Sequence, residues 1–510
     1  SNSTTTGQFE PAFCKGKDNL YTANLGLRDV GEVDTVKLLC SQWMYVEYIS
    51  INGKKVFLRE TIYNEKDINF GERHPYTVVV HTLDAVQTTE LKCSIVGSED
   101  TTEEYSFKKV AKIDHFEQDT SYTMEFDDTH NIGSLYGINL PVTKIFCLAY
   151  VTVKTANEKY TFEYGRRFDS SVSLSIEDQV LAMGLKTGDV KYEGAFGHIK
   201  FRLVKNPESG NAQVSPWIEF TNSDCERKEA NFQSFALTKE EKVEGYHLIE
   251  IDKVAGFCDD NKWFMDYLSI NSVCYYQRTW VKSSQNIKIY VDNPKTAYDL
   301  EIKTSKLKGA GADGDVSIVL NGEDGNTEEH KLDLENYDDR CKGDTDKYPI
   351  ADKTNIGKIK SCTLKIDGLD PGDWAFDYVK VTRLDNSDKA AESHQFNYGR
   401  YIDKSEITLS TEDTTFDLSI KSMNVKHADT GSQISVKLID ESGATQHVSE
   451  KAYIYEIDRE QVVDFKYTCL KRDDPDKQIT NVSKVSIQRE NAFWHTDGAI
   501  DYVRVGNKYF

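Results

Sequence analysis

The stretch GAGADGDVSIVLNG, residues 309–322, places a glycine-rich loop directly before a strand-like run. Three glycines fall within six positions, and the carboxylates of Asp313 and Asp315 stand among them. Polar and apolar residues then alternate in DVSIVLNG, which predicts a half-buried strand. Because glycine permits tight turns without steric cost, we expect a loop at the end of a sheet that presents two acids and backbone carbonyls.

Similar alternation recurs along the whole chain. It occurs in HIKFRLVKN (198–206), CTLKIDG (362–368), DYVKVTRL (377–384) and ISVKLIDE (434–441), with Gly, Asn and Asp clusters between the runs. The best helix candidate is only one or two turns long, near residues 239–243. A chain of 510 residues is too long for one core. These features predict an all-β chain of several domains with sandwich-like strand spacing.

An aromatic anchor followed by an acid-tyrosine strand repeats along the sequence. DNKWFMDYLSI (260–270) and PGDWAFDYVKV (371–381) share the pattern Trp, two residues, Asp-Tyr, aliphatic, any, aliphatic. DYVRV (501–505) follows its tryptophan after a longer gap, and two further copies are weaker. The five anchors are Trp43, Phe146, Trp263, Trp374 and Trp494. They are 103 to 120 residues apart, so one repeat unit has the size of a complete sandwich domain.

A second repeated motif follows the anchors and indicates the joints between units. It occurs as EYGRRF (163–168), YYQRTW (275–280) and NYGRYI (397–402), with NFGERH (69–74) as a poorer copy. Serine-rich stretches follow it, and no flexible Gly/Ser or Pro linker separates the units, so we expect stiff packing. The predicted units are 1–72 (a partial, divergent unit), 73–168, 169–282, 283–402 and 403–510.

The clearest unit resembles a known family. YDLEIKTSKLKGAGADGDVSIVLNGEDGN (298–326), continued by IGKIKSCTLKIDGLDPGDWAFDYVKV (356–381), resembles the PLAT/LH2 domain, a β-sandwich found in lipoxygenases, lipases and polycystins. GAFGHIKFRL (194–203) and QISVKL (433–438) keep parts of the same pattern, and the first two units diverge from it. The resemblance implies a tandem array of eight-stranded antiparallel PLAT-like sandwiches.

The resemblance also implies a calcium site, because some relatives bind calcium at this sandwich end and use it to approach membranes. The match carries over to one loop and to the loop before Trp374. The candidate metal ligands are Gly311, Asp313, Asp315, Asp367, Asp370 and Asp373. Ca²⁺ takes about six to eight oxygen ligands, which two such loops could supply. The alternative is that these acids are solvated turn residues, since the chain contains 84 Asp and Glu.

Phe196 is a candidate contact residue for a membrane or a protein partner. It stands in a loop between Gly194 and Gly197. An exposed aromatic there would insert into a membrane interface or a partner pocket. The alternative hypothesis is that Phe196 folds over the end of its own sandwich.

The number and spacing of the cysteines indicate whether the protein is extracellular or cytosolic. The 10 cysteines contain no CxxC, which argues against zinc, and their even, scattered distribution favours extracellular disulfides over buried free thiols. The candidate pairs are Cys14–Cys40, Cys93–Cys147, Cys225–Cys258 and Cys341–Cys362. Asn2 (NST) and Asn481 (NVS) are glycosylation sequons. No signal-like apolar segment leads the chain, which fits a processed secreted protein or a cytosolic one.

Charge and motifs limit the function classes. A net charge of -22 argues against a nucleic-acid partner. The sequence contains no GxSxG nucleophile elbow, no HExxH zinc motif and no Walker phosphate-binding loop, so no motif indicates an enzyme. The sequence therefore predicts a non-enzymatic, secreted or surface-exposed binding or scaffold protein that associates with a protein or a membrane surface, with Ca²⁺ as the candidate cofactor. The alternatives are an extracellular assembly protein formed by self-association (fibre, coat or matrix) and a lipid- or glycan-acting hydrolase. Residues 1–72 would fit a unit completed by another chain or by a removed segment.

Overall fold

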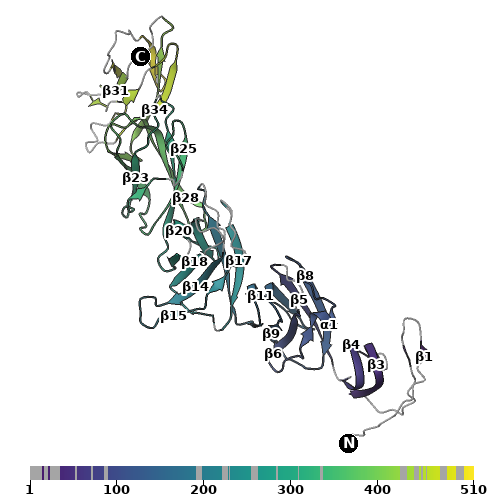
Figure 1. Ribbon diagram of the computed structural model, residues 1–510. Coiled ribbons are helices and arrows are strands. Elements are labelled where there is room, and N and C mark those ends of the chain that lie inside the picture. Colours follow the sequence, from purple (N-terminus) through teal and green to yellow (C-terminus); the bar gives the residue numbers. More distant parts are fainter. Residues whose placement is uncertain are drawn as a thin grey trace. The chain divides into compact units, whose positions relative to one another are not determined.

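The computed structural model divides into two compact units, residues 1–177 and 178–510. The residues that the structure describes are 14–15, 21–22, 35–51, 54–69, 73–84, 90–190, 198–220, 228, 230–239, 241–253, 262–282, 285–307, 309–333, 337–425, 434–441, 447–449, 452–454, 457–470, 479–489 and 499–510. Nearly all of them lie in antiparallel strands or their connections (Figure 1). Within these ranges, no helix has the length and apolarity to cross a bilayer.

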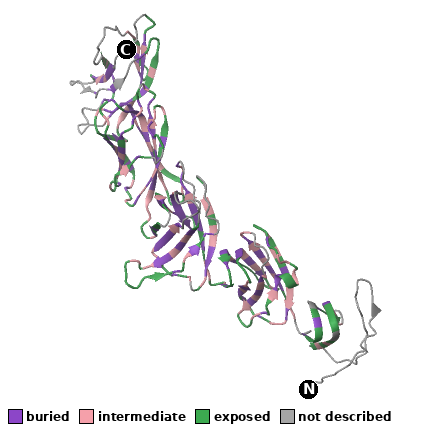
Figure 2. Cartoon of the chain, viewed as in Figure 1, coloured by how far each residue is buried: buried purple, intermediate pink, exposed green. Residues whose placement is uncertain are grey.

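The first unit begins with hairpins. The short strands β1 (Cys14–Lys15) and β2 (Tyr21–Thr22) pair, and the long strands β3 (Thr35–Ile51) and β4 (Lys54–Asn69) pair in a separate two-stranded sheet. Most described side chains of the long hairpin are exposed (Figure 2). Trp43 is 72% exposed and stacks on Tyr63. The described part of residues 1–72 thus forms hairpins, in place of the predicted partial sandwich.

The rest of the first unit is a sandwich, here called sandwich 1. Its elements are β5 (His74–Thr82), β6 (Lys92–Gly97), β7 (Tyr105–Ser106), α1 (Phe107–Val110), β8 (Ser121–Asp128), β9 (Leu135–Pro141), β10 (Phe146–Lys154), β11 (Lys159–Phe168) and β12 (Ser171–Ser175). The sheets have the orders β11-β10-β5-β8 and β12-β9-β6-β7. Alternating buried residues from both sheets form one core, which includes Phe146.

The second unit holds three further sandwiches. Sandwich 2 consists of β13 (Gln179–Thr187), β14 (Ile199–Lys205), β15 (Gln213–Val214), β16 (Ile218–Glu219), β17 (Ala230–Leu237), β18 (Leu248–Lys253), β19 (Trp263–Ile270), β20 (Val273–Val281) and β21 (Asn286–Tyr290). Its sheets have the orders β17-β13-β19-β20 and β15-β14-β18-β21, and β16 also pairs with β14.

Sandwich 3 repeats this arrangement. It consists of β22 (Thr296–Thr304), β23 (Asp315–Gly322), β24 (His330–Lys331), β25 (Thr345–Asp352), β26 (Ile359–Asp367), β27 (Ala375–Leu384), β28 (Ala390–Tyr401) and β29 (Glu406–Ser410). Its sheets have the orders β25-β22-β27-β28 and β24-β23-β26-β29. The predicted loop-strand stretch thus supplies β23, an inner strand of the second sheet.

Sandwich 4 consists of β30 (Thr414–Ser422), β31 (Ile434–Asp440), β32 (His447–Val448), β33 (Ala452–Ile454), β34 (Val462–Cys469), β35 (Lys484–Arg489), β36 (Ile500–Val505) and β37 (Lys508–Tyr509). One sheet has the order β34-β30-β36-β37. In the other, β31 pairs with β32, β33 and β35. Each sandwich of the second unit therefore has its own core.

The repeated tryptophans lie at equivalent places. Trp263 starts β19 and Trp374 directly precedes β27, and both are fully buried. Each indole donates its N–H to a threonine at the end of the paired strand, Thr187 at 2.9 Å and Thr304 at 3.4 Å. This equivalence confirms the repeat between sandwiches 2 and 3. The last anchor, Trp494, lies outside the described residues.

In sandwiches 2 to 4, the acid of the acid-tyrosine strand sits at a break in the strand register. The pairing shifts at Asp266, Asp377 and Asp501, so each occupies a β-bulge beside the strand that opens its sandwich. Asp266 bonds to Arg278, and Asp501 pairs with Lys421 at 2.9 Å. These three acids therefore occupy structural positions at the bulges.

The boundaries between sandwiches lie later than the sequence predicted. The serine-rich stretches that follow the joint motifs were expected to open new units, but they form β12, β21 and β29. These strands pair with β9, β18 and β26 of the preceding sandwich. The first boundary therefore falls after residue 177 and not after residue 168. The alternating pattern of a five-residue strand is compatible with the preceding sandwich and with the following one. Only the strand with which it pairs shows to which sandwich it belongs.

Candidate functional site

The loops predicted to bind calcium meet at one end of sandwich 3. Asp315 opens β23 and lies opposite Asp367, the last residue of β26. Asp315 is paired with Lys331 at 3.0 Å. In the second loop, the carboxylate of Asp373 accepts the backbone N–H of Asp370 at 2.8 Å, so it caps its own turn. Asp313 is exposed.

The glycines of this end allow the two loops to touch. A Cβ on Gly314 would overlap the side chain of Leu369 in the neighbouring loop. A Cβ on Gly311 would stand 3.3 Å from the backbone nitrogen of Lys342. The glycine-rich stretch thus serves close packing of three loops at the sandwich end.

A buried arginine that sequence reasoning missed lies beneath the glycine loop. The Arg340 guanidinium donates to the carbonyls of Gly314 and Leu332, both at 2.8 Å, and pairs with Asp339 at 2.9 Å. Arg340 is 5% exposed. An internal cation is therefore already bonded to the loop that was expected to need Ca²⁺.

The described carboxylates do not fit a preformed calcium site. Among the residues that the structure describes, no three His, Cys, Asp or Glu side chains gather where they could hold a metal ion. Two of the candidate acids already have partners, and the loop carbonyl of Gly314 is bonded to Arg340. Calcium binding by Gly311, Asp313, Asp315, Asp367, Asp370 and Asp373 stays a prediction.

The joint between sandwiches 2 and 3 is built on the second repeated motif. Arg278, in β20, donates to the carbonyl of Tyr298 at 2.8 Å and pairs with Asp299 at 2.8 Å, both in β22. Its guanidinium also bonds Asp266 of its own sandwich at 3.0 Å. With a side chain only 3% exposed, Arg278 links two sandwiches through charge-assisted hydrogen bonds.

A hairpin turn of sandwich 3 completes this joint. The Tyr276 hydroxyl donates to the carbonyl of Asp385 at 2.8 Å, and the Cys274 N–H donates to the carbonyl of Asn386 at 2.8 Å. Lys186 of β13 pairs with Asp388 at 2.5 Å. Burial opposes the charge on Lys186, but its bonds to Asp388 and Asp266 outweigh burial, so its pKa lies above the ordinary value.

The joint between sandwiches 3 and 4 uses the next copy of the motif. Arg400 is fully buried and donates to the carbonyl of Thr468 in β34 at 3.0 Å. Its guanidinium stacks over the rings of Tyr398 and Tyr467. Gly399 has a φ of +72°, and a Cβ on it would overlap the carbonyl oxygen of Lys466. The structure therefore places two copies of the second repeated motif, residues 275–280 and 397–402, at joints between sandwiches, as the sequence predicted.

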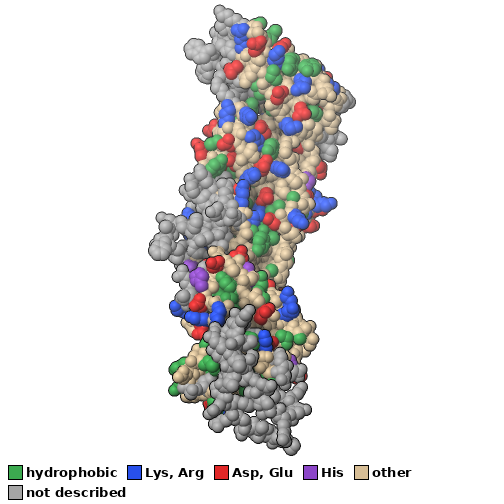
Figure 3. All heavy atoms as spheres, turned by 90° about the vertical axis from the view of Figure 1, so that its right-hand side faces the viewer, with side chains coloured by type: hydrophobic (Ala, Val, Ile, Leu, Met, Phe, Trp, Pro, Cys, Tyr) green, Lys and Arg blue, Asp and Glu red, His purple; other side chains and the backbone are tan. Residues whose placement is uncertain are grey.

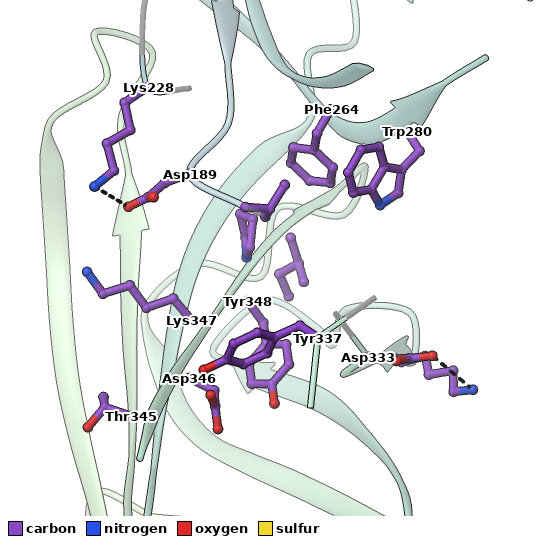
Figure 4. Close-up of a pocket in the computed structure, with 14 residues that line it drawn as sticks. Asp189, Lys228, Phe264, Trp280, Asp333, Tyr337, Thr345, Asp346, Lys347 and Tyr348 are labelled. Atoms are coloured by element: carbon purple, nitrogen blue, oxygen red, sulfur yellow. Dashed lines mark ion pairs between the residues drawn. The ribbon is translucent and has the colours of Figure 1, made fainter. Parts of the chain in front are cut away.

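A cleft of about 460 Å³ opens beside the first of these joints and is here called the joint cleft. Phe264 and Trp280 of sandwich 2 lie on one side, and Tyr337, Lys347 and Tyr348 of sandwich 3 lie on the other (Figure 4). Tyr337 is 38% exposed. The cleft thus combines an aromatic surface with the long cationic side chain of Lys347, which is exposed and which a partner can reach.

Charged side chains flank the joint cleft. Lys228 pairs with Asp189 at 3.0 Å, and Lys331 pairs with Asp333 at 3.5 Å (Figure 4). Within the described part of the chain, Lys347 has no ion-pair partner. Of the three lysines that line the cleft, Lys347 is therefore the exposed cation without an ion-pair partner among the described residues, and together with the aromatic wall it suits an acidic or aromatic group of a partner.

The cysteines do not form the predicted pairs where the structure describes them. Cys93, Cys147, Cys341 and Cys362 are free. Cys93 lies in β6 and Cys147 in β10, on opposite sheets of sandwich 1. Cys362 points into the core from β26, whereas Cys341 lies in the loop before β25. These two predicted disulfides are corrected to free thiols.

Several predicted residues lie wholly or partly outside the described residues. They are Asn2, Phe196, Cys225 and Cys258, and also the side chains of Cys14 in β1 and Cys40 in β3. Asn481 is described and exposed, and its side-chain oxygen accepts a bond from Lys508 at 2.8 Å. Glycosylation of Asn481 is sterically open and stays a prediction.

Surface charge is mixed on the face shown in Figure 3. Acidic and basic side chains lie interspersed there, without a field of one sign. Together with the net charge of -22, this argues against a phosphate-binding surface on that face.

Comparisons with known proteins agree with this architecture. The PLAT/LH2 domain model matches residues 76–177 and 298–417, which cover sandwiches 1 and 3. Lipoxygenase homology domain-containing protein 1 of Mus musculus and of Homo sapiens is 24% identical over 209 residues. The match covers 34% of this chain and 10% of each relative.

Solved structures of lipoxygenases are similar to parts of this chain. A coral 8R-lipoxygenase, described with calcium activation through a C2-like domain, is 23% identical over 22% of this chain and 16% of its own, with a TM-score of 0.20. A calcium-dependent 11R-lipoxygenase is 28% identical over 22% of this chain and 17% of its own, with a TM-score of 0.19. Two segments of this chain, residues 76–177 and 298–417, therefore match the PLAT/LH2 domain family.

Proposed function

We propose that this chain is a non-enzymatic binding scaffold whose sandwiches are held in fixed order to contact a partner. PLAT/LH2 domains mediate protein or lipid association. The observation that carries the proposal is the joint at Arg278, where one buried side chain bonds both sandwiches and the joint cleft opens beside it. A fixed cleft between two domains presents a preorganised surface, which lowers the entropy cost of binding.

A protein partner fits the joint cleft better than an anionic membrane. The chain carries a net charge of -22, which repels anionic lipid headgroups at the membrane surface. The cleft offers Trp280, Tyr337 and Lys347, residue types that anchor protein contacts when they are buried by a partner. The proposed ligand is therefore an acidic or aromatic segment of another protein.

Extracellular or cell-surface localisation forms part of the proposal, although the disulfide argument for it is weaker than the sequence predicted. The free thiols of Cys93, Cys147, Cys341 and Cys362 remove two of the four predicted disulfides as an argument. The exposed sequon at Asn481 supports this localisation. Calcium is not required for the proposed contact, since the joint cleft lies at different residues from the acidic loops.

The experiment is site-specific photocrosslinking. A photoreactive side chain at Lys347, in the cleft, should give a discrete crosslinked product with extracellular proteins, and the same group at the exposed Lys404 should not. Equal products from both positions, or none, would contradict a partner site in the cleft. Pelleting with phosphatidylcholine and phosphatidylserine vesicles, with and without Ca²⁺, tests the membrane alternative on the same samples.

A structural assembly role is the second candidate function. Sandwiches joined by buried side chains provide the stiffness that a fibre, coat or matrix protein needs. Sedimentation of the purified chain over a range of concentrations separates the two functions, because an assembly protein forms ordered polymers without any partner. A monomer at all concentrations favours the binding scaffold.

A further inference from the structure

The joint cleft runs along the edge strand of sandwich 3. Consecutive residues of β25, 345–350, line it. β25 ends its sheet, which has the order β25-β22-β27-β28, and among the residues that the structure describes no strand pairs with its other side. The equivalent strands β8, β17 and β34 also end their sheets. The repeat therefore does not supply a strand at this edge.

The pairing with β22 shows which backbone groups of β25 point outward. Lys303 of β22 lies opposite Thr345. The next residue, Thr304, donates its N–H to the carbonyl of Asp344 at 3.0 Å. This bond marks Lys303 and Thr345 as a non-hydrogen-bonded pair, and the two kinds of pair alternate along an antiparallel ladder. The N–H and C=O groups of Thr345 and Lys347 therefore point away from β22, toward the free edge.

The equivalent strand of sandwich 4 shows what such outward groups face. In β34, the same alternation makes the carbonyls of Lys466 and Thr468 point outward. Both meet β28 of the preceding sandwich, where Gly399 packs on the first and Arg400 donates to the second. The free edge of β25 likewise faces its preceding sandwich, which lines the joint cleft with Phe264 and Trp280.

Two residues limit the length of the open edge. Pro349 has no N–H to donate, and Arg278 of sandwich 2 donates to the carbonyl of Ile350 at 3.4 Å. A lysine and a proline on an edge strand also hinder long pairing between whole sheets. Before Pro349, the exposed residues Thr345 and Lys347 keep their outward groups open. The edge therefore suits a segment of a few residues, in agreement with the cleft volume of about 460 Å³.

We propose that the joint cleft binds an extended segment of the partner as an antiparallel strand on β25, with an acidic residue opposite Lys347 and an aromatic residue directly before the acid. This inference rests on the proposed function and adds how the partner is held. The acidic residue exchanges two backbone hydrogen bonds with Lys347, and its carboxylate lies on the same face as the ammonium group. The aromatic residue lies opposite Tyr348, which lines the cleft.

The probe is the peptide acetyl-Thr-Tyr-Glu-Thr-Val-amide, and the receptor is the 510-residue chain. The bound peptide should slow hydrogen exchange of the Lys347 amide at least about tenfold, measured at residue resolution. The control peptide is N-methylated at the glutamate nitrogen. It keeps every side chain but lacks the N–H that donates to the Lys347 carbonyl, so it should bind at least about tenfold more weakly.

Charge exchange supplies a second test. Lys347→Glu should weaken binding of the glutamate peptide at least about threefold and strengthen binding of a peptide with lysine in its place, because opposite charges on facing strands attract. Lys404→Glu, at an exposed position outside the cleft, should change neither affinity.

The outcomes separate this inference from the proposed function. Equal affinities of the methylated and unmethylated peptides, or an unchanged exchange rate of the Lys347 amide, overturn strand addition. If photocrosslinking at Lys347 still gives its discrete product in that case, the partner site in the cleft stands and only the way of binding is wrong. Absence of both peptide binding and the crosslinked product overturns both proposals.

Discussion

Gly399 in β28 packs so closely on Lys466 in β34 that a Cβ on this glycine would overlap the lysine's carbonyl oxygen. Two sandwiches therefore touch backbone to backbone at a position where only glycine fits. The φ of +72° adds a second reason for glycine.

The close approach predicts a graded effect of two alanine substitutions. Gly399→Ala should lower the free energy of unfolding of the second unit by several times more than Gly368→Ala. Gly368 has nearly the same φ, +74°, but nothing lies within 4 Å of its added Cβ, so it should cost only about 1 kcal/mol. Denaturant unfolding of both variants measures the difference. Equal losses would show that the backbone conformation alone explains the glycine.

The buried arginine of the same joint predicts a second effect. Arg400→Met keeps the apolar stem but leaves the Thr468 carbonyl without its charged donor, which should cost about 2 kcal/mol. The matched control is Arg504→Met, whose side chain is 40% exposed and should cost less than about 0.5 kcal/mol. Thermal and denaturant unfolding report both values. An unchanged stability of Arg400→Met would contradict the role of this joint.

A buried acid with a histidine partner predicts the pH dependence of sandwich 1. The Asp128 carboxylate accepts the backbone N–H of His130 at 2.7 Å, its ring Nδ1 at 2.6 Å and the N–H of Glu103 at 2.9 Å. Burial opposes its ionisation, but these bonds outweigh burial, so the pKa of Asp128 lies below 3.8. The bond to this carboxylate raises the pKa of His130 above 6.5.

The signs of these two shifts define a pH window. The contribution from Asp128 is present above pH 3.8 and is lost as pH falls through its lowered pKa. The contribution from His130 is present below pH 6.5 and is lost as pH rises through its raised pKa. Unfolding midpoints should therefore favour the wild type over His130→Asn most strongly at about pH 5.5, with a smaller difference by about pH 8.5. A pH-independent difference would contradict the ion pair.

The thiol assignment predicts a labelling pattern. In the native protein without reductant, iodoacetamide should label Cys341 first, because burial raises the pKa of the Cys93 and Cys362 thiols and hides them. After denaturation without reductant, all three should become labelled, as in a reduced control. Mass spectrometry assigns the sites. Labelling of Cys341 and Cys362 that needs a reductant would restore the predicted disulfide.

Local patterns in the sequence were enough to predict the strands and the repeat. The positions of Trp263 and Trp374 and the joint roles of Arg278 and Arg400 follow from short motifs that recur at domain spacing. The family resemblance of residues 298–381 rests on the same kind of local pattern.

The sequence failed where the answer depends on distant partners. The stretch 406–410 alternates like any strand, and only its pairing with β26 assigns it to sandwich 3. Spacing also cannot tell which sheet holds Cys93 or Cys147. Arg340 bonds to Gly314, 26 residues earlier, and nothing in the intervening sequence announces that contact.

The central claim is that the sandwiches of the second unit form one stiff scaffold. Spin labels at the exposed Glu323 in sandwich 3 and Ser486 in sandwich 4 report their separation by pulsed electron resonance. For a stiff scaffold, the distance between the two labels should have one narrow distribution in the wild type and a broad one in Arg400→Met. A broad distribution in the wild type would show independent domains and would contradict the account.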